Sequence, residues 1–303
     1  MPPQGDQDIL ARFLPPVAAW FRQRYGALTP PQRLGWPAIA AGEHTLILSP
    51  TGSGKTMSAF LWGINLVAQD LLDYPDLEGV QVLYISPLKA LNNDIARNLR
   101  EPLHGIRETA HQMGYVLPDI RTAVRTGDTS ASDRRKLVTT PPQILITTPE
   151  SLYLLLTSPR AREILRTVHT VIVDEIHTLC GNKRGVHLAL TLERLGHLAD
   201  KPFQRIGLSA TQRPLDEVAR FLVGQEWAED EEGREQLVSR PVTIVDAGTQ
   251  KDLDLEVRTV VPDLRRLPGG SIWPALIPDV LTNIRRHRTT LVFANSRRGA
   301  ERA

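Results

Sequence analysis

Cysteine is almost absent from this sequence: Cys180 is the only cysteine among its 303 residues. One thiol can form neither an internal disulfide nor a cysteine-based zinc site, so small domains held together by such links are excluded. The sequence also lacks any apolar run of 18 residues, and its first ten residues carry acidic side chains where a signal peptide would be basic and apolar. We therefore expect a cytoplasmic protein that does not associate with membranes.

An excess of one charge is missing as well. The 36 Lys and Arg residues against 34 Asp and Glu residues give a net charge of +2, which is too small to indicate nucleic-acid binding by itself. The charges are unevenly placed, since residues 281–303 hold six arginines against one acid and residues 226–235 form an acidic run. For both stretches, a solvated face or loop is at least as good an interpretation as a binding surface.

What the sequence does contain is a repeated alternation of short apolar, β-branched segments with stretches long enough for a helix. This alternation predicts an α/β fold in which a parallel sheet is covered by helices on both faces. The expected strands of this sheet are residues 45–48, 80–86, 120–124, 144–148, 170–175 and 205–211. Further strands are predicted at residues 242–246, 253–261 and 289–295, with a helix near residues 273–286 and another beginning after residue 295.

The segment SPTGSGKT, residues 49–56, follows the first of these strands and predicts a loop that binds phosphate. Gly52 and Gly54 can adopt positive φ, so that successive backbone N–H groups turn toward one anion at the start of a helix. Lys55 can reach the β and γ phosphates, and the Thr56 hydroxyl can coordinate Mg²⁺. A glycine-rich surface turn is the alternative, which the strand before and the helix pattern after disfavour. The predicted nucleotide-binding residues of the loop are Thr51, Gly52, Ser53, Gly54, Lys55 and Thr56.

Two adjacent acids, Asp174 and Glu175, end a strand that is expected to be fully buried. Buried carboxylates are costly unless they meet a cation, and the Mg²⁺ of a bound nucleotide is the obvious candidate. Asp174 would hold the metal through water, Glu175 would deprotonate the attacking water, and His177 would link the nucleotide to a neighbouring segment. Capping of the next helix is the alternative, favoured only if the phosphate loop is disregarded.

The segments SPTGSGKT, SPLKALNND, TTPESL, DEIH and LSATQRP resemble, in sequence and order, the motifs of superfamily 2 ATP-dependent helicases of the DExH type. The segment DEIHTLCGNKRGVHLALTLERL is similar to the large helicase-related, or Lhr-type, branch. The similarity covers roughly residues 10–302 and resembles the amino-terminal part of such an enzyme. It implies a RecA-like P-loop NTPase domain over residues 1–240, then a linker and the start of an incomplete second RecA-like domain over residues 241–303.

The resemblance also implies roles for residues outside these two motifs. Gln32, in ALTPPQ, is similar to the residue that reads adenine in many of these enzymes, and an amide can pair with adenine N6 and N7. Phe13 could stack on the base, but its helical apolar spacing equally predicts a core position. Ser209 and Thr211 resemble the relay between the γ phosphate and the nucleic acid, with Asp174 or His177 as their partners.

Three further segments resemble the contacts of this family with nucleic acid, and each joins a strand end to a helix start. Free N–H groups at such a turn can bind backbone phosphate without reading sequence, and Lys89 and Arg125 can add charge. The predicted contact residues are Pro87, Lys89, Arg125, Gly127, Thr148, Pro149 and Glu150. Together they predict a track for single-stranded or tailed nucleic acid, with DNA favoured over RNA.

The Q-x-x-G-R-x-G-R segment with which such helicases close the ATP site is absent from the sequence. Arginine fingers are worth about 10³ to 10⁵ in rate, so this chain should bind Mg-ATP far better than it hydrolyses it. We therefore expect a first motor domain and a stub of the second, from a DNA helicase or translocase moving 3′ to 5′. A nucleotide-controlled clamp that never unwinds, and a P-loop switch or kinase unrelated to nucleic acid, remain as alternatives.

Overall fold

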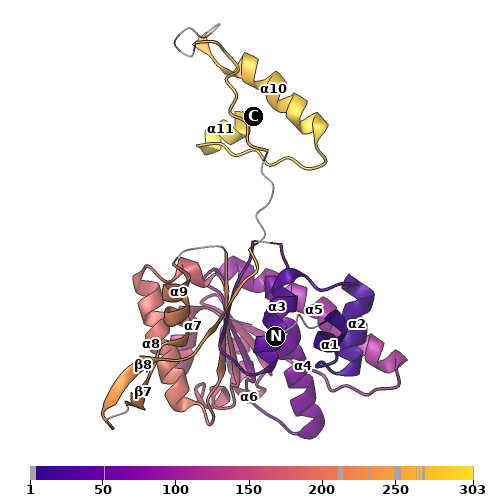
Figure 1. The fold of residues 1–303 in the computed structure, drawn as a ribbon, viewed down its shortest axis with the longest axis vertical. Coiled ribbons are helices and arrows are strands. Elements are labelled where there is room, and N and C mark those ends of the chain that lie inside the picture. The colour runs from indigo at the N-terminus through magenta and orange to yellow at the C-terminus, as the bar shows by residue number, and fades with distance from the viewer. Residues whose placement is uncertain are drawn as a thin grey trace. The chain divides into compact units, whose positions relative to one another are not determined.

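The computed structural model describes residues 5–50, 52–210, 214–230, 233–248, 254–263, 265, 267 and 270–302 (Figure 1). Within helix α5 the side chains of residues 89–91 and 93 are not described, nor is that of residue 302 in α11. The chain divides into two compact units, Met1–Thr249 and Gln250–Ala303. None of the helices in the described part of the chain is both long and apolar enough to cross a membrane.

The first unit is built on a seven-stranded sheet in the order β3-β4-β2-β5-β6-β1-β9, and every neighbouring pair is parallel. Its strands are β1 (Thr45–Leu48), β2 (Val82–Ile85), β3 (Thr122–Arg125), β4 (Ile144–Thr147), β5 (Thr170–Val173), β6 (Gln204–Ser209) and β9 (Thr243–Asp246). Because all seven run the same way, their carboxyl ends meet at one edge. The α/β fold with a parallel sheet is therefore confirmed.

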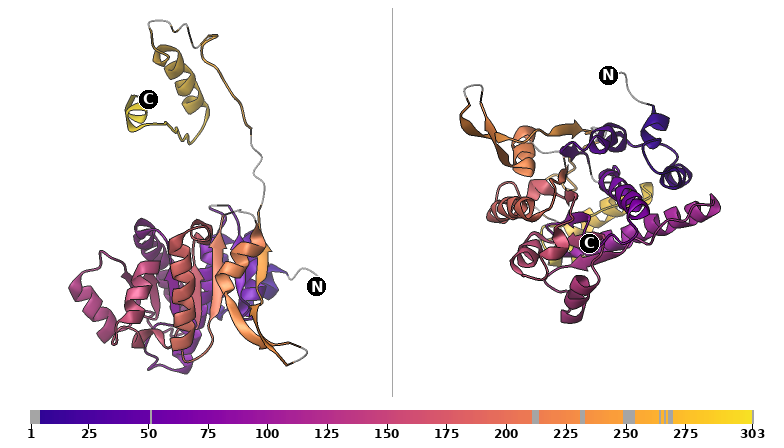
Figure 2. Two further views of the ribbon diagram at one scale, coloured as in Figure 1. Left: turned by 90° about the vertical axis from the view of Figure 1, so that its left-hand side faces the viewer. Right: turned by 90° about the horizontal axis from the view of Figure 1, so that it is seen from below.

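Helices pack on both faces of the sheet, as the two further views in Figure 2 also show. They are α1 (Asp6–Leu10), α2 (Pro15–Tyr25), α3 (Pro30–Ala40), α4 (Lys55–Asp73), α5 (Lys89–Gln112), α6 (Ala131–Thr139), α7 (Pro149–Thr157), α8 (Lys183–Leu198) and α9 (Leu215–Val223), with short 3₁₀ turns η1 (Glu163–Leu165) and η2 (Ile176–Thr178). Successive strand residues enter opposite cores: Ile47 packs with α1–α5, whereas Leu46 and Leu48 pack on the side of α6–α9. The uninterrupted apolar runs follow from burial on both faces.

The acidic run at residues 226–235, which we interpreted as a solvated segment, forms part of a hairpin. Strands β7 (Gln225–Glu229) and β8 (Glu235–Ser239) pair antiparallel and project from the first unit (Figure 1). Trp227 faces Leu237 across the strands, and Gly233 turns the chain at a φ of 76°. All residues of both strands are exposed except Ala228 and Val238, which are half-buried, so the run is a solvated segment as interpreted, and only its pairing into a hairpin was not predicted.

The second unit contains helices α10 (Trp273–Arg286) and α11 (Arg297–Arg302), as expected, but neither strand predicted for it. The described residues of 253–261 and all of 289–295 are irregular, with Val257 92% and Phe293 90% exposed. A β-branched sequence forms a strand only where a neighbouring strand pairs with it, and no strand is described in this unit. Strand β9 belongs to the sheet of the first unit, so the domain boundary lies after residue 249 rather than 240.

A buried charge network ties the base of the hairpin to the sheet. Arg205 on β6 is 4% exposed and donates to the Leu222 and Val223 carbonyls, while its Nη2 lies 3.0 Å from Glu193 Oε1. Arg240, after β8, donates to both oxygens of Glu193, each over 2.9 Å. Glu193 on α8 therefore neutralises two arginines from different elements.

Replacing Glu193 with glutamine should lower the free energy of unfolding by about 1 to 2 kcal/mol, because Arg205 would stay buried without a counter-charge while the partly exposed carboxylate is screened. Urea titration followed by circular dichroism measures the change. Glu163→Gln is the control, since it removes an exposed carboxylate that pairs with Arg162 and Arg166 at the surface and should change little. Equal effects of both variants would contradict this account.

Candidate nucleotide and nucleic-acid site

Apart from Gln32, which lies in α3, the predicted site residues follow the carboxyl ends of six strands, so the topology brings their loops to one edge of the sheet. The nucleotide-binding loops follow β1, β5 and β6, which are neighbours in the order β5-β6-β1. The predicted nucleic-acid loops follow β3, β4 and β2, which are neighbours on the other side of β5. The edge is thus divided into two adjoining halves, although in the sequence the three nucleic-acid loops lie between the first nucleotide loop and the other two.

The phosphate loop has the backbone that its glycines were predicted to allow. Gly52 and Gly54 have φ of 80° and 91°, and α4 begins directly after Gly54 at Lys55. A Cβ on Gly54 would lie 3.0 Å from Thr29 Oγ1 and 3.2 Å from Gln32 Nε2, so the loop and the ALTPPQ segment are in contact. Thr51 lies outside the described residues. Gln32 is 3% exposed, and its Oε1 accepts the Thr29 N–H over 2.8 Å, which leaves its amide group beside the loop.

The side chain of Lys55 connects the loop to the acids after β5. Its ammonium is buried, donates to the Ser49 carbonyl over 3.3 Å, and lies 3.7 Å from Glu175 Oε1. A buried ammonium with one carbonyl and one carboxylate as partners can exchange either for phosphate oxygens at little cost. The predicted convergence of Lys55 and Glu175 is present in the structure.

Asp174 directly follows β5 and is 5% exposed. Its Oδ1 accepts the N–H of Glu175 over 2.9 Å, and its Oδ2 accepts the Tyr84 hydroxyl in a short hydrogen bond. Burial raises the pKa of the Asp174 carboxyl, an effect opposed by the hydrogen bond from Tyr84. Each carboxylate oxygen therefore has one hydrogen-bond partner within the protein, and the water-mediated metal contact of Asp174 stays a prediction.

Glu175 and His177 form the next part of the site. Glu175 has a φ of 47°, the sole positive φ of a non-glycine residue in the described part of the chain, and such strain is concentrated at functional sites. Its Oε2 lies 3.3 Å from His177 Nε2. The N–H of Ala210 points to His177 Nδ1 over 3.3 Å, and Ser209 Oγ lies 3.2 Å from the same nitrogen. His177 therefore joins the acid to the segment after β6, and its Nε2 carries the proton in the neutral ring.

The predictions for Ser209 and Thr211, the expected relay between nucleotide and nucleic acid, have different outcomes. Ser209 pairs with His177, which is one of the two partners expected for it, and not with Asp174. Thr211 lies outside the described residues.

Phe13, which could have stacked on a base, is 5% exposed and packs edge-to-face with Trp36 and Trp62, so it is a core residue.

The predicted nucleic-acid residues lie on adjoining loops, but their side chains differ in how far they are exposed to a ligand. Pro87 follows β2, and Lys89 begins α5 with a side chain outside the described part. Arg125 is 6% exposed and donates to the Thr126 carbonyl, and burial, followed by the charge of Arg134, lowers the pKa of its guanidinium. This cation is turned into the protein and not toward solvent, contrary to the expectation that it adds surface charge.

The loops after β3 and β4 are held by hydrogen bonds from their own residues and from neighbouring helices. The Gly127 carbonyl accepts Arg134 Nη2 over 2.8 Å. Thr148 caps α7 by accepting the Ser151 N–H over 3.3 Å, and Pro149 occupies the first position of that helix. Burial acts to raise the pKa of the Glu150 carboxyl, but the hydrogen bond and charge of Arg184 outweigh it, so the pKa lies below its ordinary value. Hydrogen bonds within the chain therefore fix both loops.

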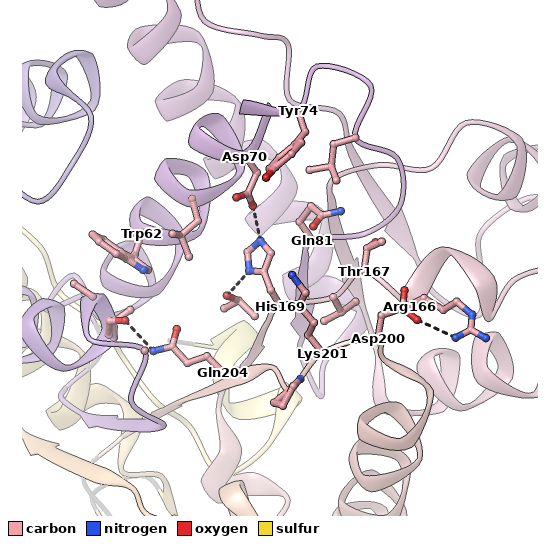
Figure 3. Close-up of a pocket in the computed structure, with 18 residues that line it drawn as sticks. Trp62, Asp70, Tyr74, Gln81, Arg166, Thr167, His169, Asp200, Lys201 and Gln204 are labelled. Carbon is pink, nitrogen blue, oxygen red and sulfur yellow. Dashed lines mark hydrogen bonds and ion pairs between the residues drawn. The ribbon is translucent and has the colours of Figure 1, made fainter. Parts of the chain in front are cut away.

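A separate cavity of about 610 Å³ lies at the opposite edge of the sheet (Figure 3). His169 stands in it with Nε2 3.1 Å from Asp70 Oδ2, and Arg166 pairs with Asp200 at its rim. None of the described site residues lines this cavity. The predicted chemistry is therefore confined to the carboxyl edge.

A parallel sheet with a phosphate loop after β1 and paired acids after β5 defines the class of P-loop nucleotide-binding proteins. The DEAD/DEAH box helicase family matches residues 29–218, and the chain belongs to this family. It is 49% identical over 295 residues to the Lhr helicase/probable uracil glycosylase of Mycolicibacterium smegmatis, covering 97% of this chain and 18% of that protein. It is 50% identical over 297 residues to the ATP-dependent helicase Lhr-Core protein 2 of Thermococcus barophilus, covering 98% and 33%.

Among solved structures, Mycobacterium smegmatis helicase Lhr bound to ssDNA and AMP-PNP matches with a TM-score of 0.81 at 49% identity, covering 97% of this chain and 35% of that one. These findings confirm the resemblance to the Lhr-type branch and the RecA-like fold of the first unit. The chain spans 18% to 35% of the length of the relatives and the solved chain that it matches here.

Proposed function

We propose that the chain is the nucleotide-binding part of an ATP-dependent helicase or translocase that moves on nucleic acid. The observation that carries this proposal is the approach of Lys55 to Glu175 at the carboxyl edge, next to loops that resemble nucleic-acid contacts. One edge would thus hold a triphosphate on one half and a strand on the other.

In this function each polar residue has a defined task. The Lys55 ammonium leaves Ser49 and Glu175 to bind the β and γ phosphates, and Gln32 reads adenine beside the loop. Glu175, freed from Lys55, orients a water molecule and accepts its proton. His177 then reports the loss of the γ phosphate to Ser209 through Nδ1. The strained backbone at Glu175 fixes the carboxylate in the direction that this task requires.

The magnesium ion of Mg-ATP fits the oxygens present. Thr56 and Asp174 offer a hydroxyl and a carboxylate, and hard oxygen ligands are those that Mg²⁺ prefers. When bound, the ion would neutralise charge that develops on the phosphates. Among the described residues no group of three His, Cys, Asp or Glu side chains could hold a metal.

For the track we propose single-stranded DNA, traversed 3′ to 5′. The support for DNA is the ssDNA in the structure of the M. smegmatis helicase, to which this chain is 49% identical. Backbone contacts through N–H groups do not distinguish bases, so no sequence preference is expected. A second candidate is a nucleotide-controlled clamp that holds nucleic acid when ATP is bound and never unwinds it; stoichiometric binding without turnover would favour it.

The proposal is tested by fluorescence anisotropy with labelled single-stranded DNA and RNA at low salt, and by an ATPase assay with and without DNA. We expect binding of DNA, Mg²⁺-dependent binding of ATP, and little stimulated turnover by this chain. Failure to bind any oligonucleotide would instead favour a nucleotide switch unrelated to nucleic acid. Strand displacement on 3′- and 5′-tailed duplexes, with a longer protein that contains this sequence, would decide polarity and unwinding.

A further inference from the structure

Arg184 connects two of the loops on the nucleic-acid half of the edge. Its Nε donates to Glu150 Oε1 over 2.6 Å, and its Nη2 donates to the Pro87 carbonyl over 2.9 Å. Pro87 follows β2 and Glu150 opens α7 after β4, and these two strands are neighbours in the sheet. One guanidinium therefore spans two loops that are separated by more than sixty residues of sequence but lie side by side.

The position of Arg184 is itself fixed by the segment that follows DEIH. Asn182 caps α8 by accepting the Gly185 N–H over 3.1 Å, and its Nδ2 donates to the Thr178 carbonyl of η2 over 2.6 Å. A Cβ on Gly185 would lie 1.9 Å from the Leu179 carbonyl oxygen, so the start of α8 packs directly against the end of the DEIH turn. Helices α7 and α8 lie side by side (Figure 1).

An exposed ion pair of this kind contributes little to unfolding stability. The side chains of Arg184 and Glu150 are 46% and 52% exposed, and such pairs are screened by solvent. Because Arg184 also donates a hydrogen bond to the Pro87 carbonyl, it sets the distance between the Pro87 loop and the Glu150 loop. The fork of the guanidinium can satisfy both partners at once, which a lysine cannot do with the same geometry.

We propose that Arg184 is a positioning residue that holds the Pro87 and Glu150 loops at the spacing of one bound strand, and that Glu150 acts through Arg184 without contacting the strand itself. This inference rests on the proposed function. A free carboxylate on the track would repel phosphate, whereas one paired with Arg184 is neutralised and orients the arginine. The site so defined takes the sugar-phosphate backbone of a single strand.

The test measures the affinity of the purified chain for a labelled oligothymidylate by anisotropy across a range of salt concentrations. Arg184→Ala should raise Kd about tenfold at every salt concentration, because two charge-assisted hydrogen bonds are lost from the loops. Arg184→Lys should recover part of the loss. Glu150→Gln should also raise Kd, although it removes a negative charge from the track, and the double variant should be no weaker than Arg184→Ala alone.

Arg166→Ala and Glu163→Gln are the matched controls, since they break an exposed Arg–Glu pair away from the carboxyl edge and should leave Kd unchanged. All variants should retain Mg-ATP-analogue binding and the wild-type melting temperature within a few degrees. Tighter binding by Glu150→Gln would overturn the inference, as would wild-type affinity in Arg184→Ala. A fall of about 0.7 in the salt slope for Arg184→Ala would assign a direct phosphate contact instead. Absence of wild-type binding would overturn the proposed function itself.

Discussion

Lys55→Ala should weaken binding of Mg-ATP by about 100-fold or more. The lysine is expected to make two charge-assisted hydrogen bonds to the β and γ phosphates, each worth about 1.5 kcal/mol, and 1.4 kcal/mol corresponds to a factor of ten. In the structure its ammonium is already buried beside Ser49 and Glu175, so the lysine is held next to the predicted phosphate position. Titration with a fluorescent ATP analogue in the presence of Mg²⁺ measures the loss.

The control for this variant is Lys201→Ala, which removes an exposed lysine at the rim of the cavity on the opposite edge of the sheet. It carries the same change in net charge and should leave the affinity unaltered. Thermal melting of both variants shows whether the fold is retained. Wild-type affinity in Lys55→Ala, with an intact fold, would mean that the triphosphate binds elsewhere.

Glu175→Gln should preserve nucleotide binding and lower the residual rate of ATP hydrolysis by about 10² to 10⁴. Glutamine has the same shape and can hold a water molecule, but its amide cannot accept the proton that the water must lose. It fits the backbone at Glu175 as readily as glutamate does, because the side chains differ only at their ends. Single-turnover hydrolysis of γ-³²P-ATP over hours measures a rate that is slow in the wild type.

Asp73→Asn is the control, because it changes a carboxylate at the far end of α4 that lies outside the site. Its rate should equal that of the wild type. If Glu175→Gln hydrolyses ATP as fast as the wild type, Glu175 is not the general base. If it loses nucleotide binding as well, its contact with Lys55 is structural and not catalytic.

The fold was predictable where the signal is local and was not where it depends on pairing. The apolar runs before the phosphate loop and before DEIH became β1 and β5 because each can be buried on both faces. The order of the strands could not be derived, since it depends on contacts between distant segments. The run ending in Phe293 has the composition of a strand but no described partner, and the hairpin at Trp227 was concealed by its acids.

The site, too, was predictable where the signal is local and was not where it depends on contacts between distant residues. The phosphate loop and the DEIH segment are each one continuous stretch of sequence, so residue types and spacing were enough to predict that Lys55 and Glu175 lie close together. Tyr84 was missed because its partner Asp174 is 90 residues away, and an apolar strand shows no sign of where a tyrosine hydroxyl points. Arg184 was missed for the same reason, with partners 34 and 97 residues distant. Only the folded sheet brings these groups together.

The central claim is that one Mg-ATP molecule bridges the loop after β1 and the acids after β5. The most direct test is a crystal structure of the chain with Mg²⁺ and a non-hydrolysable ATP analogue. We expect Lys55 Nζ within hydrogen-bonding distance of the γ phosphate, and the metal joined to Thr56 directly and to Asp174 through water. A triphosphate bound at the His169 cavity, or one that contacts the loop while its metal lies beyond reach of Asp174, would contradict the account.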